Sequence, residues 1–257
     1  MDLGLAGRIA LVMGSSQGLG YACAAGLARE GAHVILTGRH RLSLEASCDA
    51  IRAEGGQASC HVVDFQYMKH LDDMKKEIAD VDIVVTNCGG PPPGEAARID
   101  VSDLEQYFTA MVRVPIATVE MYLPAMRQRK FGRIINIVSS GVLQPIANLS
   151  LSNTLRPALV GWAKTLSAEV AADGVTVNSV VPGRIHTRRV DSLNAAAAAR
   201  QGRSVEEVSR ASCEAIPMQR YGDPAEFADM VTFLASARAS YVTGTLIRVD
   251  GGLVRSV

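Results

Sequence analysis

Short apolar runs alternate with longer segments of helical pattern along the whole chain. Seven runs rich in β-branched residues have the length of strands: Ile9–Met13, Val34–Leu36, Val62–Val63, Ile83–Val85, Ile134–Val138, Val175–Val180 and Leu246–Val249. Because these runs lack polar alternation, they are typical of strands that are covered on both faces. The helical segments between them are 18–30, 41–54, 67–79, 103–129, 155–172 and 223–235. This order predicts an α/β fold with a doubly wound parallel sheet and right-handed crossovers.

A single domain is expected across residues 1–257. The chain has 257 residues, of which 48% are hydrophobic, so it can bury one large core. No repeat or long linker divides it. One polar stretch, from about 184 to 215, has no strand pattern and contains the alanine run Ala195–Ala199. It predicts two short helices that form a mobile flap. Helical packing on the protein surface is the alternative.

Charge and cysteine usage narrow the classes of function. Lys plus Arg and Asp plus Glu number 26 each, without a basic run, which disfavours nucleic acid and membranes as partners. We therefore expect a small-molecule ligand. The five cysteines are scattered without the spacing of a metal or redox site, so we expect no metal and a reducing, cytoplasmic location. The apolar run near residue 9 is too short for a signal peptide or a membrane span.

A glycine-rich loop follows the first predicted strand and opens a helix. Its candidate cofactor-binding residues are Gly14, Ser16, Gln17, Gly18, Leu19 and Gly20. Glycine lets the backbone approach a pyrophosphate, and the helix N-terminus adds unpaired N–H groups and a partial positive charge. The glycine spacing differs from that of the common dinucleotide fingerprint. A tight strand-to-helix turn without a ligand is the alternative.

The second predicted strand is followed by Arg39. A carboxylate at this point would hydrogen-bond an adenosine ribose and repel a 2′-phosphate, whereas an arginine can pair with that phosphate. Arg39 therefore favours NADP(H) over NAD(H) as the cofactor. A solvated arginine at the end of a strand is the alternative.

Further motifs, in the same order, resemble those of the short-chain dehydrogenases/reductases, in particular the 3-oxoacyl-acyl-carrier-protein reductases. The motifs are Asp64-Phe65, Thr86-Asn87-Cys88-Gly89, the stretch from Asn178 through Pro182-Gly183 and Ile185 to Thr187, and residues 217–226. The resemblance covers essentially the whole chain and implies a Rossmann fold. It implies that Asp64 and Phe65 lie at the adenine ring, that Asn87 and Gly89 bind the cofactor, and that Pro182, Gly183, Ile185 and Thr187 lie at the nicotinamide end.

These positions also have a physical explanation that does not depend on the family. The carboxyl ends of parallel strands meet at one edge of a sheet, where open α/β sheets bind ligands. Turn formation is the alternative for Asp64, Asn87 and Pro182-Gly183, because these residue types favour turns.

The same resemblance locates the reaction centre. In the family, a Tyr protonates the substrate carbonyl oxygen, a Lys four residues later holds the nicotinamide ribose, a Ser orients the substrate and an Asn anchors a water. Flanking matches place Ser139 at the Ser position, Ser152 at the Tyr position and Arg156 at the Lys position. Met111 stands where the Asn belongs. Only Ser139 therefore matches the family pattern.

The replacements differ in what they can do. Serine is a much weaker acid than a phenol. Its side chain is also too short for the hydroxyl to reach a substrate that is bound as in the family. Arg156 can donate to ribose hydroxyls but will not release a proton near neutral pH. Pro157 is expected to push Arg156 away from helical geometry. Cofactor binding should thus survive better than proton transfer.

Two substitutes for the missing proton donor are open. His186 lies beside the expected nicotinamide and titrates in a useful range, with an exposed loop histidine as the alternative. A water held by Ser139 and Ser152 is the other candidate. Tyr122 and Tyr221 lie too far from this register to serve.

Two functions remain open from the sequence. The first is an NADP(H)-dependent oxidoreductase that acts on a carbonyl or alcohol substrate with a non-standard proton donor. The second is a catalytically inactive NADP(H)-binding homologue that acts as a sensor or as a partner subunit. The apolar surface of segments 103–129 and 155–172 predicts a homo-oligomer, either the tetramer that the resemblance suggests or a dimer.

Overall fold

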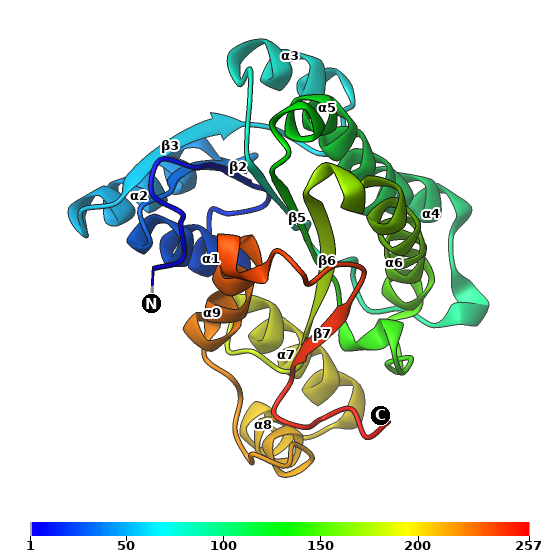
Figure 1. The fold of residues 1–257 in the computed structure, drawn as a ribbon. Coiled ribbons are helices and arrows are strands. Elements are labelled where there is room, and N and C mark those ends of the chain that lie inside the picture. Colours follow the sequence, from blue (N-terminus) through cyan, green and yellow to red (C-terminus); the bar gives the residue numbers. More distant parts are fainter. Residues whose placement is uncertain (1, 257) are drawn as a thin grey trace.

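All strands of the structure belong to one parallel sheet (Figure 1). The computed structural model describes residues 2–256. In that range the strands are β1 (Ile9–Val12), β2 (His33–Gly38), β3 (Gln57–Val62), β4 (Ile83–Thr86), β5 (Gly132–Ile137), β6 (Val175–Pro182) and β7 (Leu246–Val249). Their order across the sheet is β3-β2-β1-β4-β5-β6-β7. The predicted α/β fold with a doubly wound parallel sheet is confirmed.

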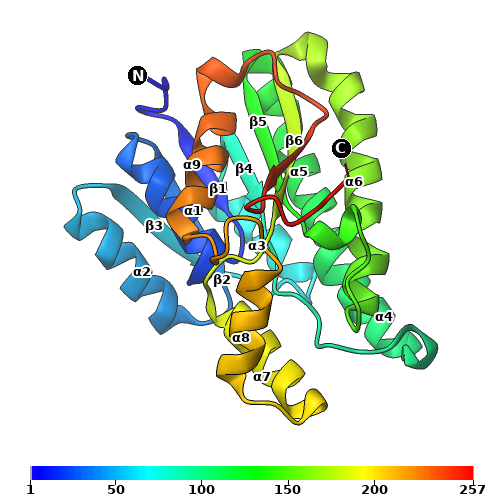
Figure 2. The same cartoon turned by 90° about the horizontal axis from the view of Figure 1, so that it is seen from below.

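Helices cover both faces of the sheet, as Figure 2 shows. They are α1 (Gly18–Arg29), α2 (Arg41–Ala53), α3 (Lys69–Glu77), α4 (Val101–Phe108), α5 (Val114–Arg129), α6 (Ser150–Val170), α7 (Arg188–Gln201), α8 (Val205–Glu214) and α9 (Pro224–Ala235). Strand residues alternate between two cores: Val12 packs with α1, α2 and α9, whereas Leu11 packs with α3, α5 and α6. None of the helices in the described range has the length and apolar character needed to cross a membrane.

Helix α6 begins five residues before the predicted start at 155, and Pro157 lies inside it. The expectation that Pro157 would push Arg156 out of helical geometry is therefore wrong. The extra turn is held from outside, because the Asn153 side chain accepts from the N–H of Ile146 at 3.1 Å and donates to its carbonyl at 2.8 Å. These contacts offset the backbone hydrogen bond that a proline cannot make.

The predicted continuous helix 103–129 is interrupted. A π-helical turn, Thr109–Arg113, separates α4 from α5, and the N–H of Val114 donates to the carbonyl of Thr109 five residues earlier. Pro115 explains the break, because it has no N–H to donate to the carbonyl of Met111. The widened turn lies beside the expected reaction centre, and such turns are frequent at functional sites.

Strand β3 extends five residues further toward the N-terminus than the apolar pair Val62–Val63 predicts. It is an edge strand of the sheet; its first residue, Gln57, is exposed, Ala58 is small and buried, and the other four residues are only partly covered. Hydrophobic pattern alone could not reveal a strand that has so little to bury.

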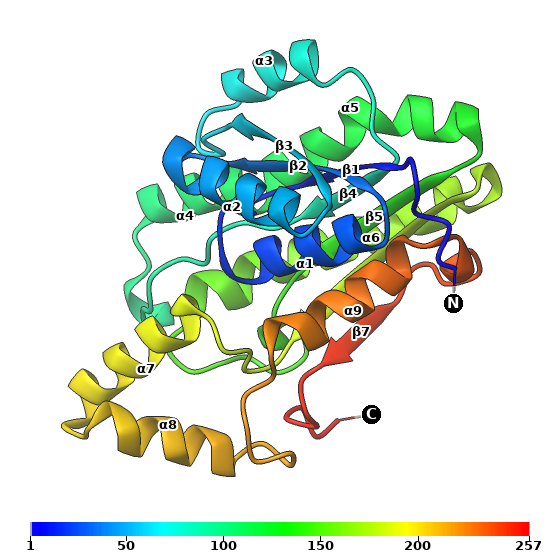
Figure 3. The ribbon, with the colours of Figure 1, turned by 90° about the vertical axis from the view of Figure 1, so that its left-hand side faces the viewer.

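The stretch from 184 to 215 forms the two predicted helices, α7 and α8, which project beyond the carboxyl end of the sheet in Figure 3. They are joined through the Tyr221 hydroxyl, which lies 3.0 Å from Asn194 Nδ2 and 3.3 Å from Ser209 Oγ. A parallel bridge between Ile185 and Gly222 fixes the base of this flap beside the start of α9.

An ion pair at the start of α9 is predicted to make stability depend on pH. Arg220 donates two hydrogen bonds, of 2.8 and 2.6 Å, to the Glu226 carboxylate and lowers its pKa from 4.5 to about 2. A carboxyl with a depressed folded-state pKa contributes stability above its unfolded pKa and loses it as the pH falls. The thermal unfolding midpoint of Glu226→Gln should therefore lie furthest below that of wild type above about pH 4.5. The difference between the two midpoints should shrink as the pH falls toward 2.

The matched control is Asp229→Asn, an exposed position on the same helix that forms no ion pair within residues 2–256. Its acid profile should follow that of wild type. A constant gap between Glu226→Gln and wild type across the whole pH range would contradict the role given to the ion pair.

Candidate active site

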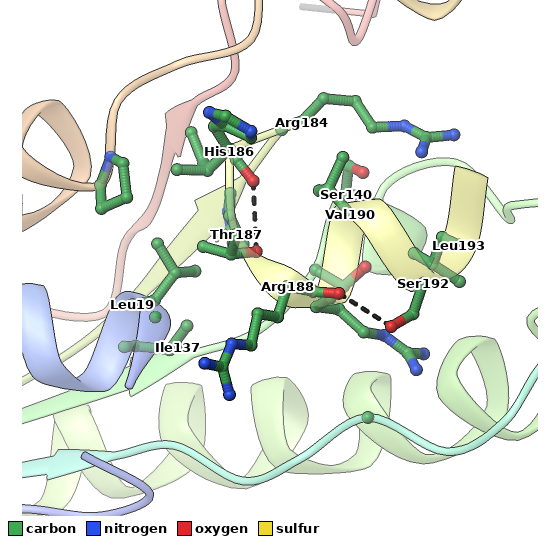
Figure 4. Close-up of a pocket in the computed structure, with 18 of the residues that line it drawn as sticks. Leu19, Ile137, Ser140, Arg184, His186, Thr187, Arg188, Val190, Ser192 and Leu193 are labelled. Atoms are coloured by element: carbon green, nitrogen blue, oxygen red, sulfur yellow. Dashed lines mark hydrogen bonds between the residues drawn. The ribbon is translucent and has the colours of Figure 1, made fainter. Parts of the chain in front are cut away.

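A cleft of about 1950 Å³ lies at the carboxyl ends of the strands. Its walls come from the segments that follow β1, β2, β4, β5 and β6, from the start of α6 and from the flap (Figure 4). The predicted site residues that line it are Gly14, Ser16, Gln17, Gly18, Leu19, Arg39, Asn87, Gly89, Ser139, Ser152, Arg156, Pro182, Gly183, Ile185 and Thr187. Gly20, Asp64 and Phe65 are the predicted residues that do not line it.

The loop from Gly14 to Gly20 is tied to the neighbouring strands by its own polar atoms. The Ser15 hydroxyl donates to the carbonyl of Val12 at 2.7 Å and accepts from the N–H of Thr37 at 2.9 Å. Gln17 is the N-cap of α1, makes no side-chain cap and is followed by a first turn without acidic residues. The free N–H groups and the positive end of the helix dipole therefore face the cleft, which suits an anionic ligand.

Asn87 holds this loop in place from the adjacent strand. Its side-chain amide donates to the carbonyl of Gly14 at 3.0 Å. A Cβ on Gly20 would lie 2.3 Å from the Gly14 carbonyl oxygen and 2.9 Å from Nδ2 of Asn87. Gly20 thus permits the close approach of helix and loop instead of facing the cleft.

Asp64 and Phe65 follow β3 and are not among the residues that line the cleft. The Asp64 carboxylate accepts from the N–H of Gln66 at 3.1 Å, which is a turn contact. Phe65 packs against the core layer that contains α3 and α5. Their contact with an adenine ring stays a prediction.

Arg39 follows β2 at the far end of the cleft, together with Ser16 and Ser43. Its side chain is exposed and forms no ion pair within residues 2–256. The guanidinium is therefore available to an anionic ligand.

Ser139 and Ser152 both line the cleft where β5 ends and α6 begins. The Ser139 hydroxyl accepts from the N–H of Gly141 at 3.1 Å, which fixes its direction. Ser152 is buried in the first turn of α6, with 6% of its surface exposed. Both residues therefore line the cleft, and their roles at the reaction centre stay a prediction.

Arg156 lies one helical turn after Ser152, and 9% of its surface is exposed. Its Nη1 donates to the carbonyl of Ile137 at 3.0 Å, which anchors the guanidinium at the end of β5. It also lies near Cys88, since burial raises the pKa of that thiol while the positive charge of Arg156 opposes the shift. Arg156 is also among the residues that line the cleft.

Met111 occupies the π-helical turn and is fully buried. It packs with Val112 and Leu155, and Cys88 and Tyr107 cover this small cluster. An apolar contact thus fills the position at which the sequence comparison expects an amide, and it joins α6 to the interrupted helix.

The other titratable candidates are His186, Tyr122 and Tyr221. His186 lines the cleft, and its side chain is exposed. Tyr122 is fully buried, donates to the carbonyl of Ile78, and its pKa is raised to about 12 because burial disfavours the phenolate. Tyr221 holds the flap helices together.

The chain matches the family described as enoyl-(acyl carrier protein) reductase over residues 14–254. It belongs to the short-chain dehydrogenase/reductase family. The NADPH-dependent reductase BacG of Bacillus subtilis is 30% identical over 97% of this chain and 99% of its own. The 3-oxoacyl-[acyl-carrier-protein] reductase FabG of Vibrio cholerae is 33% identical over 98% of this chain and 99% of its own.

The structure is similar to that of L-sorbose reductase from Gluconobacter frateurii complexed with NADPH and L-sorbose. The TM-score is 0.93, with 28% identity and full coverage of both chains. The cleft of this family member contains Ser152 and Arg156, the residues that the register of the sequence predicts at the family's tyrosine and lysine positions.

Three arginines of the flap were not among the site residues predicted from the sequence. Arg184, Arg188 and Arg189 all line the cleft, and Figure 4 shows Arg184 extending past Ser140 while Arg188 extends toward Ile137. Nη1 of Arg188 donates to Oε1 of Gln17 at 3.0 Å and so connects the flap to the glycine-rich loop. The signal that could have revealed them is two adjacent arginines in the first turn of a helix, where cations are unfavourable.

Gly20→Ala is predicted to displace the glycine-rich loop, because the new Cβ would meet the Gly14 carbonyl oxygen at 2.3 Å. Overpacking of this kind costs about 1–3 kcal/mol, so the midpoint of thermal unfolding should fall by several degrees. The control is Gly161→Ala in α6, whose Cβ would enter open space. That variant should match or exceed wild-type stability, because alanine favours helices. Equal stability of the two variants would contradict the contact.

Proposed function

We propose that this protein is an NADP(H)-dependent oxidoreductase that interconverts a carbonyl compound and its alcohol without a tyrosine proton donor. One observation carries the proposal: a single cleft joins the glycine-rich loop and Arg39 at one end to Ser139, Ser152 and Arg156 at the other. The names of the relatives support the same chemistry, since BacG is called an NADPH-dependent reductase and L-sorbose reductase was solved with NADPH.

The residues of the cleft fit a dinucleotide phosphate. Gly14 and Gly18 have positive φ angles of 58° and 60°, which bring backbone N–H groups to the surface of the loop. The N-terminus of α1 would hold the pyrophosphate and Arg39 the 2′-phosphate. Arg156 would donate to the nicotinamide ribose hydroxyls, and Ile185 and Thr187 would border the nicotinamide. When bound, NADP(H) supplies or accepts a hydride.

The remaining groups orient the substrate and supply its proton. Ser139, held by the N–H of Gly141, donates a hydrogen bond to the carbonyl oxygen of the substrate. A water bound by the hydroxyls of Ser139 and Ser152 gives the proton to that oxygen, and solvent returns a proton to the hydroxide that remains. Arg156 stays protonated, and its charge stabilises the negative charge that develops on the oxygen. Because the loss of one general acid costs about 10²–10⁴-fold in rate, positioning alone leaves a slow or specialised enzyme.

A second candidate function is a catalytically inactive NADP(H)-binding homologue, a sensor or a partner subunit. The buried Met111 favours it, because a thioether cannot hold a water by hydrogen bonding as an amide can. The two functions share the cofactor and differ only in turnover.

Turnover decides between them. Purified protein is titrated with NADPH by fluorescence, and loss of NADPH absorbance is then followed with ketones, 3-oxoacyl thioesters and quinones. We expect NADPH to bind and at least one carbonyl class to be reduced. Binding of NADPH without oxidation by any substrate would favour the inactive homologue.

The double variant Ser152→Tyr with Arg156→Lys restores the residue types that the family pattern contains. If water is the working proton donor, the new phenol should displace it and lower the existing rate by about 10²-fold or more. Tight NADPH binding by the variant is the control that its fold is intact. A rate that rises above that of wild type would contradict the water-based site.

Arg39→Asp is predicted to reverse the cofactor preference. The carboxylate should weaken NADPH binding by about 10- to 100-fold through loss of a charge-assisted pair, and leave NADH binding equal or tighter. Arg41→Asp is the matched control, because it makes the same charge change at an exposed residue outside the cleft. Equal losses for NADPH and NADH in Arg39→Asp would exclude its role at the 2′-phosphate.

We also infer a homo-oligomer in the cytoplasm. Large apolar side chains are exposed on α4 (Val101 and Phe108) and beside the edge strand β7 (Tyr241 and Leu246), where a second copy could cover them. The five free cysteines suit a reducing compartment. Sedimentation of the purified protein at the mass of a single chain would contradict the oligomer.

A further inference from the structure

The cleft is strongly basic although the chain as a whole is neutral. Lys plus Arg and Asp plus Glu number 26 each, yet nine arginines and no aspartate, glutamate or lysine line the cleft. Only Arg29 and Arg203 among these nine have a carboxylate partner within residues 2–256, Glu54 and Glu207. The positive charge therefore gathers at the site and is not neutralised by the protein itself.

The two arginines that open α7 extend to different parts of the cleft. Arg188 donates to Gln17 in the glycine-rich loop, at the end proposed for the cofactor. Arg189 donates instead to the carbonyl of Pro91, in the segment that follows β4, through Nη2 at 2.6 Å. Arg188 and Arg39 thus lie at the proposed cofactor end, whereas Arg189 lies elsewhere in the cleft and has no carboxylate partner within residues 2–256.

Arg189 lies at the reaction centre. Its guanidinium lies directly against Gly90, where a Cβ would come within 2.9 Å of Nη2 and 3.1 Å of Cζ. Two residues earlier, Cys88 lies beside Arg156, which follows Ser152 by one helical turn. Glycine at position 90 therefore leaves room for a second guanidinium next to the proposed catalytic wall.

The electrostatic environment of Arg189 is unfavourable in the absence of an anion. Burial lowers the pKa of its guanidinium, and the nearby positive charge of Arg156 lowers it further. Both arginines donate to backbone carbonyls and form no ion pair within the described residues. Arg189 also lies in the first turn of α7, at the positive end of the helix dipole, and Thr187 provides no side-chain cap there. An anionic ligand would relieve each of these costs at once.

We propose that the substrate carries an anionic group, a carboxylate or a phosphate ester, close to its reacting carbonyl, and that Arg189 binds this group. The proposal rests on the proposed oxidoreductase function and names its substrate class. Two planar N–H groups of the guanidinium match two oxygens of either anion. The anion is close to the carbonyl because Arg189 lies near Arg156, which follows Ser152 by one helical turn. Neutral ketones of equal size lack the group that this wall is built to hold.

The test compares matched pairs of compounds that differ in charge. Acetoacetate is paired with its methyl ester, and dihydroxyacetone phosphate with dihydroxyacetone. Each is titrated by calorimetry into wild-type protein saturated with NADP⁺, so that the cofactor phosphates are already bound and no reduction occurs. The anion of at least one pair should bind about 10- to 100-fold more tightly than its neutral partner. The pair that shows the larger preference identifies carboxylate or phosphate as the anion.

Three variants assign the preference to Arg189. Arg189→Gln should bind the anion and its neutral partner equally, and Arg189→Lys should keep part of the preference, because it keeps the charge but not the planar fork. Arg210→Gln removes the same charge from an exposed position on α8 outside the cleft and should behave as wild type. NADP⁺ affinity, measured for all three, should be unchanged and shows that each variant is folded.

Equal or undetectable binding of both members of both pairs would overturn the proposal. So would an undiminished preference in Arg189→Gln with intact NADP⁺ affinity. The proposed function fails in a different way, through absence of NADPH binding or of turnover. Anion binding to the NADP⁺-saturated protein decides the present inference whether or not turnover is found.

Discussion

The common direction of the strands is the constraint on which the site depends. Because all neighbouring strands are parallel, the segments that follow β1, β2, β4, β5 and β6 meet at one edge of the sheet and form one cleft. The glycine-rich loop is held at this edge by the Asn87 side chain, which donates to the Gly14 carbonyl. Gly20 contributes because it has no Cβ, so α1 and the loop can approach each other closely. The cofactor end of the cleft is thus determined by the fold itself.

At the proposed reaction end of the cleft, Arg156 and Met111 are held by contacts that are consistent with one another. Arg156 is anchored to the end of β5, and Met111 seals the π-helical turn with an apolar contact to α6. The result is a rigid wall with two serine hydroxyls and concentrated positive charge instead of a phenol. Such a wall is suited to hold an oxygen that becomes negative during reaction, and it leaves the proton to solvent.

Much of the fold could be predicted from the sequence because buried strands and amphipathic helices leave a periodic pattern. The seven strands and the flap helices follow from it, whereas the polar edge strand β3 extends where no apolar run exists. The early start of α6 depends on Asn153 contacts with Ile146, which no periodicity encodes. Likewise, Ser139, Ser152 and Arg156 could be placed by register, but Arg189 reaches Pro91 only through the folded flap.

The most direct test of the central claim is a crystal structure of the protein with NADP⁺ bound. Phosphates should lie at the N-terminus of α1 and at Arg39, and ribose hydroxyls at Arg156. An ordered water should contact the hydroxyls of both Ser139 and Ser152. A nicotinamide bound away from this wall, or a protein side chain that fills the space above Ser152, would contradict it.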